Sequence, residues 1–278
     1  MQLFVASIFL SHLASCFALN NGLARTPPCG LNSYMECPVG EVFLESIGDY
    51  FIQTGMHASC FTFVNSDEGW ELNDRDNSTH ELRPDPALWP SGLSNFTARL
   101  AAKGLKFGLY GAASGVTCNG VTTGQLGYED LDVASFARWG VGFLKSDNCA
   151  SYGMDSSVRF AATRDALLRA NASIVYSIEP FSISPDIRQS SKIANMWRVA
   201  VDMGRECWKC VLDRASISDK WAPLAGPGGW NDVRVYLAPS RFLKLIVQDS
   251  IGFLHFLFYL LRHTHTHTHT LSLARSPT

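Results

Sequence analysis

A lysine and an aspartate stand two positions apart in the middle of the chain, at Lys145 and Asp147, directly after the apolar residues 141–144. An apolar run of this kind predicts a buried strand. Side chains at positions i and i+2 of a strand point to the same face, so the ammonium group and the carboxylate should lie together where the strand ends. A nearby cation keeps a carboxylate ionised, and an ionised carboxylate can serve as a nucleophile. We therefore interpret Asp147 as a candidate nucleophile.

A second candidate acid is Asp202, which ends the predicted strand 196–202. Retaining glycosidases use two carboxyl groups about 5–5.5 Å apart. Adjacent strands lie about 4.8 Å apart, so inward side chains from strands two positions apart in a sheet could reach that separation. Arg198 shares strand parity with Asp202 and is expected on the same face. The pattern fits a double displacement with Asp202 as acid and then base, but two ordinary carboxylates at loop edges would show the same spacing.

The elements that must position these acids alternate between apolar, β-branched runs and stretches with helical apolar spacing, at intervals of roughly 30 residues. Strands are predicted at residues 29–34, 60–66, 106–110, 141–147, 173–179, 196–202 and 224–232. Helices are predicted at residues 42–54, 93–103, 131–139 and 156–170. This alternation predicts an α/β fold with a parallel sheet, and polar residues at the strand ends fit the active face of a (β/α)8 TIM barrel. A Rossmann-type fold is disfavoured because no G-x-G-x-x-G follows the first strand.

The composition is that of a globular domain with a sizeable core, since hydrophobic residues make up 46% of the chain. The net charge is only −2 and no Lys/Arg cluster is present, which argues against a nucleic-acid partner. After residue 232 no eighth βα unit is recognisable, so we expect a barrel truncated after the seventh strand. Residues 251–261 are apolar but too short to cross a bilayer, and no membrane span is expected.

The amino terminus predicts a secretory signal peptide over residues 1–18, with cleavage after Ala18; an apolar strand is the alternative. Three glycosylation sequons agree with secretion, at Asn77, Asn95 and Asn171. Seven of the eight cysteines follow the leader: Cys29, Cys37, Cys60, Cys118, Cys149, Cys207 and Cys210. In a secreted chain most of them should form disulfides, and the odd number leaves one over. We expect a secreted or lysosomal protein.

The carboxyl-terminal part has a different character. Residues 263–270 alternate strictly between histidine and threonine, which a translated CA dinucleotide repeat would encode. We interpret the chain from about Val233 as read-through of non-coding sequence, with a His-rich metal site as the alternative. The expected organisation is a leader at 1–18, an incomplete catalytic barrel at 19–237 and a low-complexity tail at 238–278.

Four separated blocks, in the correct order, resemble the signature blocks of glycoside hydrolase family 27, the α-galactosidases or melibiases. They are residues 21–28, 104–110, 143–149 and 226–232. The resemblance implies a (β/α)8 barrel followed by an antiparallel β domain, for which no sequence is recognisable here. It also implies a retaining hydrolase that releases terminal α-linked galactose from oligosaccharides or glycoconjugates, that needs no metal or cofactor, and for which a homodimer is possible.

Position by position, the resemblance places the family's nucleophile on Asp147 and its acid/base on Asp202. It places sugar-binding residues on Tyr34, Asp67, Glu68, Tyr110, Lys145, Glu179 and Arg198. It also implies an active-site disulfide between Cys118 and Cys149. Some positions depart from the family: Glu68 stands where a second Asp is more usual, and Arg234 replaces a sugar-binding Asp.

Glu179 bears on substrate specificity. The resemblance implies that a Glu here hydrogen-bonds the sugar 2-hydroxyl in α-galactosidases, whereas a small Ser makes room for the acetamido group in α-N-acetylgalactosaminidases. Glu179 therefore favours galactose, with the N-acetyl substrate as the alternative. A third possibility is an inactive sugar-binding or truncated relative, because an open seven-stranded barrel leaves two sheet edges exposed.

Overall fold

The computed structural model describes residues 19–34, 39–180, 187–202 and 208–232. The predicted leader (1–18) and tail (238–278) lie outside these residues, as do Cys37 and Cys207. Within the described part of the chain, no helix combines the length and the apolar character that crossing a bilayer requires.

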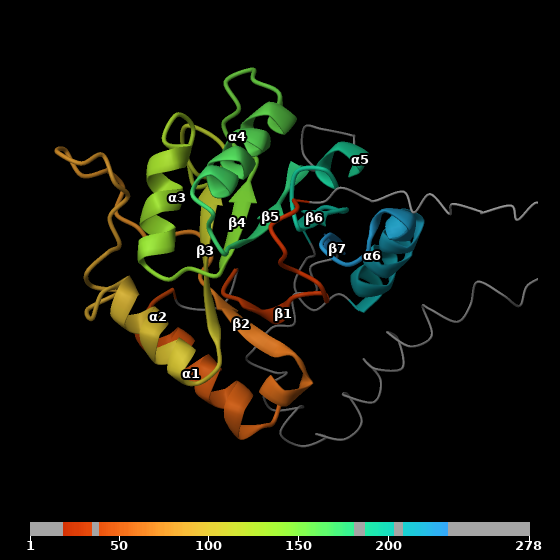
Figure 1. The fold of residues 1–278 in the computed structure, drawn as a ribbon, viewed down its shortest axis with the longest axis horizontal. Coiled ribbons are helices and arrows are strands. Elements are labelled where there is room, and N and C mark those ends of the chain that lie inside the picture. The colour runs from red at the N-terminus through yellow and green to blue at the C-terminus, as the bar shows by residue number, and fades with distance from the viewer. Residues whose placement is uncertain (1–18, 35–38, 181–186, 203–207, 233–278) are drawn as a thin grey trace, which may run out of the picture.

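The described residues form one parallel sheet of seven strands, in which spatial order equals sequence order. Every neighbouring pair is parallel, and the sheet curls into a half-barrel with β1 and β7 at its ends (Figure 1). The strands are β1 (Cys29–Asn32), β2 (Phe61–Asn65), β3 (Lys106–Ala112), β4 (Phe143–Asp147), β5 (Val175–Ile178), β6 (Met196–Arg198) and β7 (Trp230–Asp232). The predicted parallel sheet of repeated βα units is confirmed.

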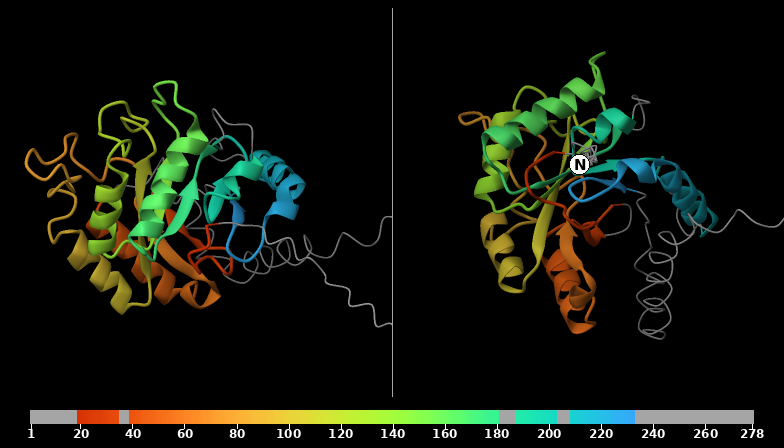
Figure 2. Two further views of the ribbon diagram at one scale, coloured as in Figure 1. Left: turned by 45° about the horizontal axis from the view of Figure 1, so that its top comes forward. Right: turned by 45° about the vertical axis from the view of Figure 1, so that its right-hand side comes forward.

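Each connection between successive strands contains a helix, and the helices lie outside the curved sheet (Figure 2). They are α1 (Glu41–Gln53), α2 (Leu93–Ala102), α3 (Glu129–Arg138), α4 (Ser156–Arg169), α5 (Ile187–Ser190) and α6 (Trp208–Trp221), with short 3-10 turns η1 (His57–Ser59) and η3 (Ala222–Leu224). In α1, Leu44, Ile47 and Phe51 recur at helical spacing and are buried. The helix α4 begins at the Asp155 cap, whose carboxylate accepts a hydrogen bond from Ser157 N.

Six of the seven strands are shorter than predicted, β6 and β7 by the largest margins, and two helices were not predicted. The strand β6 ends at Arg198, so the prediction that Asp202 terminates this strand is wrong; the chain leaves the sheet four residues earlier. The strand β7 covers only residues 230–232, because residues 226–229 form a tight turn in which Gly228 adopts φ 105°. The helices α5 and α6 were missed, and α5 is only four residues long.

The amino-terminal segment closes the end of the sheet opposite the strand carboxyl ends. The fully buried Asn195 donates from Nδ2 to Leu19 O (3.1 Å) and Gly228 O (3.0 Å), and accepts from Tyr176 N (3.1 Å). Asn21 exchanges side-chain hydrogen bonds with Asn195. These bonds bind three segments distant in sequence to one side chain, and they place residues 19–24 between β5 and the turn before β7.

Candidate active site

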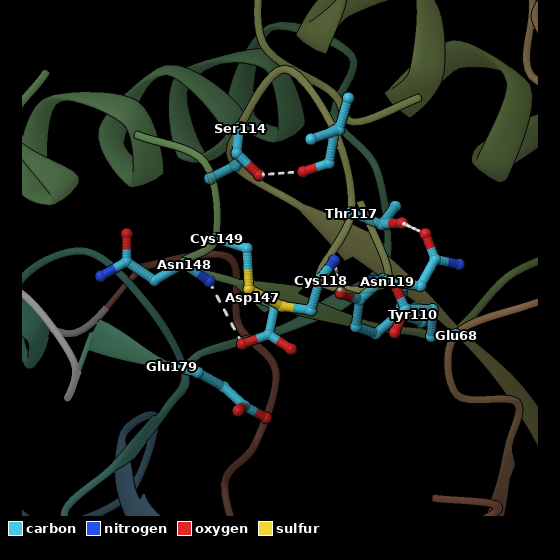
Figure 3. The surroundings of a disulfide bond; sticks show 12 residues. Glu68, Tyr110, Ser114, Thr117, Cys118, Asn119, Asp147, Asn148, Cys149 and Glu179 are labelled. Carbon is cyan, nitrogen blue, oxygen red and sulfur yellow. Dashed lines mark hydrogen bonds between the residues drawn. A yellow bond between two sulfur atoms is a disulfide. The ribbon is translucent and has the colours of Figure 1, made fainter. Parts of the chain in front are cut away.

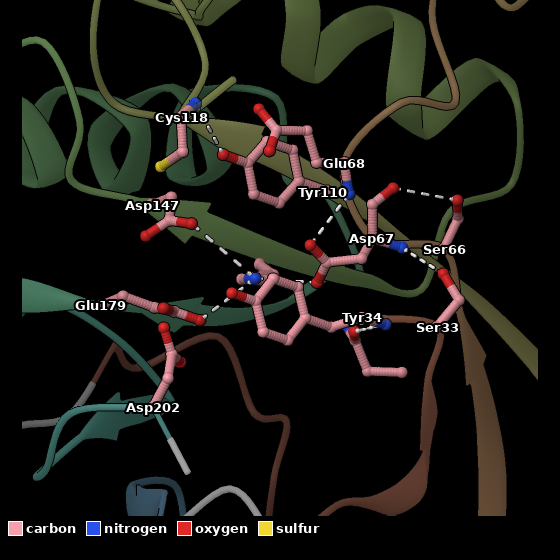
Figure 4. Close-up of polar contacts among 12 residues, drawn as sticks. Ser33, Tyr34, Ser66, Asp67, Glu68, Tyr110, Cys118, Asp147, Glu179 and Asp202 are labelled. Carbon is pink, nitrogen blue, oxygen red and sulfur yellow. Dashed lines mark hydrogen bonds and ion pairs between the residues drawn. The ribbon is translucent and has the colours of Figure 1, made fainter. Parts of the chain in front are cut away.

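The predicted site residues gather at the carboxyl ends of successive strands, as expected for parallel strands that share one edge. Figure 4 shows Tyr34, Asp67, Asp147, Glu179 and Asp202 facing a common centre. Tyr34 follows β1, Asp67 and Glu68 follow β2, Tyr110 lies in β3, Lys145 and Asp147 end β4, Glu179 follows β5, and Arg198 ends β6 with Asp202 beyond it. The structure thus brings together side chains from six strands.

Lys145 is the electrostatic centre of this cluster. Its side chain is 2% exposed, and Nζ lies 2.7 Å from Asp67 Oδ2, 3.5 Å from Glu179 Oε1 and 3.8 Å from Asp147 Oδ2. The contact with Asp147 confirms that the two residues share a face of β4. A buried ammonium group is stable only with compensating negative charge, and three carboxylates supply it here. The lysine therefore orients three acids toward one point.

Arg198 provides a second cation and connects Glu179 to Asp202. Its Nη1 lies 2.6 Å from Glu179 Oε2 and forms an ion pair with the Asp202 carboxylate. The predicted proximity of Arg198 and Asp202 is confirmed, but it arises from a turn after β6 and not from strand alternation. From α6, Arg214 donates to the backbone oxygens of Val201 (3.0 Å) and Asp202 (3.4 Å). This helix therefore fixes the segment that carries the second acid.

The two candidate catalytic acids differ in their access to solvent. The side chain of Asp147 is 17% exposed and accepts a hydrogen bond from Asn148 N at 3.2 Å. The side chain of Asp202 is 43% exposed. An acid/base that must activate water needs such access. The predicted separation of the two carboxyl groups stays a prediction.

Two phenols border the site. The ring centroids of Tyr34 and Tyr110 lie 5.0 and 4.9 Å from Lys145 Nζ, within the range of cation–π attraction. Burial raises the pKa of Tyr34, and the negative charge of Asp202 adds to this effect. Burial also raises the pKa of Tyr110, followed by the charge of Asp147. Both phenols therefore stay protonated and remain available as hydrogen-bond donors.

Asp67 and Glu68 point in different directions. Asp67 N donates to Ser33 Oγ (2.9 Å), which holds this residue against β1 while its carboxylate meets Lys145. Glu68 Oε1 accepts a hydrogen bond from Asn119 N at 2.8 Å, in the loop after β3. In the structure, Glu68 therefore supports this loop, and its predicted contact with sugar stays a prediction.

A disulfide joins Cys118 and Cys149, as the resemblance implied, with the two Cα atoms 5.2 Å apart (Figure 3). It connects the loop after β3 to the residue two positions beyond Asp147. Cys118 N also lies 3.4 Å from the Tyr110 hydroxyl. The sulfur atoms lie close to the Asp147 carboxylate, but they are bonded to each other and are not free thiolate ligands. The bridge restrains the segment that carries the candidate nucleophile.

Two residues that hold the segment after Asp147, Asn148 and Arg159, were not predicted from the sequence. The guanidinium of Arg159, on α4, is 1% exposed and donates to Ala113 O and Asn148 Oδ1. Asn148 in turn lies 3.4 Å from Pro180 O. Asn148 belongs to the matched block 143–149 and could have been singled out there. Arg159 sits in an ordinary helical stretch, and no local pattern marks it.

Glu71 gives a prediction for the pH dependence of stability. Its side chain is buried, Oε2 has no hydrogen-bond partner among the described residues, and burial raises its pKa to about 7 from 4.5. A raised pKa in the folded state favours the protonated form. The preference of the folded state for a protonated Glu71 stabilises the protein fully below about pH 4.5, and this contribution is lost as the pH rises through 7. We expect Glu71→Gln to remove about 2–3 kcal/mol of this dependence.

Urea unfolding of the Glu71→Gln variant at pH 5 and pH 8 measures this effect. The difference in free energy of unfolding between variant and wild type should shift in favour of the variant when the pH is raised from 5 to 8. Asp130→Asn removes an exposed carboxylate of α3 and is the control, which should leave the pH dependence unchanged. If the free energy of unfolding of Glu71→Gln changed between pH 5 and pH 8 as much as that of the wild type, Glu71 would not be the source of this pH dependence.

Comparison with known proteins agrees with this geometry. The sequence matches the melibiase family described as alpha galactosidase A over residues 29–243. It is 33% identical over 235 residues to alpha-galactosidase 2 of Arabidopsis thaliana, covering 82% of this chain and 59% of that protein. It is 30% identical over 236 residues to alpha-N-acetylgalactosaminidase of Gallus gallus, covering 77% of this chain and 58% of that protein.

A solved structure shows the same fold. Alpha-galactosidase I of Mortierella vinacea superposes with a TM-score of 0.68 at 29% identity, covering 77% of this chain and 60% of that chain. The chain therefore spans less than two thirds of the length of each of these proteins.

Proposed function

The chain belongs to the melibiase family of α-galactosidases, and from this we propose that it is a retaining hydrolase that releases terminal α-linked galactose by double displacement. The observation that carries the proposal is the buried Lys145 surrounded by Asp67, Asp147 and Glu179, with Arg198 holding Asp202 beside them. Such a set of fixed charges can bind sugar hydroxyls and place two carboxyl groups against one glycosidic bond.

In the first step of the proposed mechanism, the Asp147 carboxylate attacks the anomeric carbon of the bound galactose. Asp202 in its protonated form donates a proton to the leaving oxygen, so the aglycone departs as a neutral alcohol. The product is a covalent glycosyl-enzyme on Asp147. Lys145 Nζ lies 3.8 Å from the carboxylate and holds it in position before the attack.

In the second step, Asp202 is a carboxylate and removes a proton from water, which attacks the anomeric carbon from the vacated face. The bond to Asp147 breaks, galactose leaves with retained configuration, and Asp202 is protonated again. The solvent access of Asp202 suits this role. Tyr34, Asp67, Glu68, Tyr110 and Glu179 are the proposed contacts to the sugar.

Glu179 supports galactose over N-acetylgalactosamine as the substrate. Its buried carboxylate is held by Lys145 and Arg198, so it cannot swing aside to admit an acetamido group. We expect kcat/KM for p-nitrophenyl α-galactoside to exceed that for the N-acetyl analogue by about 10²-fold. Glu179→Ser should lower the ratio of kcat/KM for the galactoside to kcat/KM for the N-acetyl analogue. Faster hydrolysis of the N-acetyl substrate by the wild type would contradict the proposal and favour an α-N-acetylgalactosaminidase.

A sugar-binding relative without turnover is the other candidate. The two candidates differ in a simple measurement. An active protein releases p-nitrophenol from the galactoside, whereas an inactive relative binds galactose without releasing it.

We propose a secreted or lysosomal glycoprotein, since Asn77, Asn95 and Asn171 are all exposed and glycans could be attached without burial. The Cys118–Cys149 disulfide agrees with an oxidising compartment. The signal peptide and the homodimer remain predictions from the sequence and the resemblance.

A further inference from the structure

Two further cysteines lie against each other at the start of the first two strands. Cys29 is the first residue of β1 and Cys60 immediately precedes β2. Their Sγ atoms are 2.6 Å apart. Non-bonded heavy atoms pack at about 3.5–4.0 Å, whereas a disulfide bond is about 2.05 Å long. The two sulfur atoms thus lie closer than separate thiols pack, at a distance that bond formation would shorten only slightly.

The surrounding backbone holds the two residues in this position. β1 and β2 are paired in parallel, and the register shifts between Cys29 and Gly30. Cys60 has φ 88°, a conformation that residues other than glycine rarely adopt. Hydrogen bonds from Cys60 N to His57 O and from Phe61 N to Met56 O, both 3.2 Å, fix this conformation. A cysteine here places its side chain toward β1, which a glycine could not do.

We propose that Cys29 and Cys60 form a disulfide that links β1 to β2 at the end of the sheet opposite the active site. The reaction begins at the exposed Cys60, whose thiolate attacks a small disulfide such as oxidised glutathione and releases one glutathione thiol. Cys29 then attacks the Cys60 sulfur and releases the second. The protein dithiol is oxidised by two electrons, and one glutathione disulfide is reduced to two thiols.

The order of attack follows from the surroundings of the two sulfurs. Cys29 is half-buried, and burial together with the neighbouring Cys60 raises the pKa of its thiol to about 12. Cys60 is exposed to solvent and can meet a reagent first. Once Cys60 carries glutathione, its sulfur is an electrophile beside Cys29 Sγ, so the second attack takes place within the protein.

The proposed bond would act on stability and not on chemistry. It closes a loop that contains α1 and η1, and restricting this loop in the unfolded chain favours the folded state. The site residues of the same two strands, Tyr34 and Asp67, lie at the other end. The proposal therefore does not depend on the glycosidase function and would stand without it.

Peptide mapping of the folded full-length chain tests the bond directly. The protein is equilibrated with oxidised glutathione, alkylated at acid pH and digested without reductant. We expect a peptide pair joined through Cys29 and Cys60, lighter by two hydrogen atoms than the free peptides. The Cys118–Cys149 bridge serves as an internal control for oxidising conditions. Alkylated Cys29 and Cys60 in a sample whose Cys118–Cys149 bridge is intact would overturn the proposal.

Serine variants test the effect on stability. Under oxidising conditions, Cys29→Ser, Cys60→Ser and the double variant should each lower Tm by the same amount, about 5–10 °C. Equal losses are expected because either substitution removes the whole bond. Turnover of p-nitrophenyl α-galactoside, if present in the wild type, should not change. Losses that add in the double variant would indicate two independent packing effects and would count against the bond.

Discussion

Replacing Asp147 with asparagine is expected to lower kcat on p-nitrophenyl α-galactoside by about 10³-fold or more. The amide has nearly the same shape as the carboxylate but cannot attack the anomeric carbon. It can still accept the hydrogen bond from Asn148 N, and the ion pair that it loses is the longest of the three at Lys145. The folded state should therefore persist, and steady-state kinetics beside a thermal melt measures both effects.

The control for this variant is Asp155→Asn. Asp155 is an exposed carboxylate that caps α4, and asparagine caps helices equally well. This change should leave both kcat and Tm close to the wild-type values. If Asp147→Asn retained more than about a tenth of the wild-type kcat, the nucleophile assignment would be wrong.

Replacing Lys145 with methionine is expected to reduce both stability and activity. Methionine has a similar length but no charge, so Asp67, Asp147 and Glu179 would lose their shared cation. Removing one partner of a buried ion pair typically costs about 3–5 kcal/mol. Loss of a fixed charge in the site should also lower kcat/KM by about 10²–10³-fold. Urea unfolding and kinetics on the same preparation measure the two losses.

Lys106→Met provides the matched control. Lys106 begins the neighbouring strand β3, is exposed, and lies over the Phe63 ring at the opposite end of the sheet. We expect its replacement to change stability by less than about 1 kcal/mol and to leave kinetics unaltered. Equal effects of the two substitutions would show that Lys145 has no special role in the site.

The strands could be predicted because each is a short apolar run that ends in polar residues. The run 141–147, for example, predicts β4 and places Lys145 and Asp147 on one face, as the structure shows. Because the strands are parallel, their carboxyl ends lie at one edge of the sheet, which can be predicted without knowing any side-chain contact. The sequence could not show that Lys145 meets Asp67, 78 positions earlier, because such a contact depends on tertiary packing.

Other parts of the site depend on tertiary contacts, which no local sequence pattern predicts. The strand β6 ends at Arg198, although the residues that follow it have strand character, and Asp202 approaches Arg198 through a turn that no strand pattern predicts. The helix α6 lies in a stretch between β6 and β7 for which no helix was predicted, and Ile217 and Trp221 pack from it against the core. Arg159 supports Asn148 from a helix whose sequence carries no functional signal.

The most direct test of the proposed mechanism is to trap the covalent intermediate. An activated α-galactoside with ring fluorine substitution slows the second step, so the glycosyl-enzyme should accumulate. We predict that mass spectrometry of the full-length protein finds one fluorinated galactosyl group, and that digestion places it on the peptide that contains Asp147. An adduct on any other residue, or turnover of this substrate by folded protein with inverted configuration, would contradict a double displacement at Asp147.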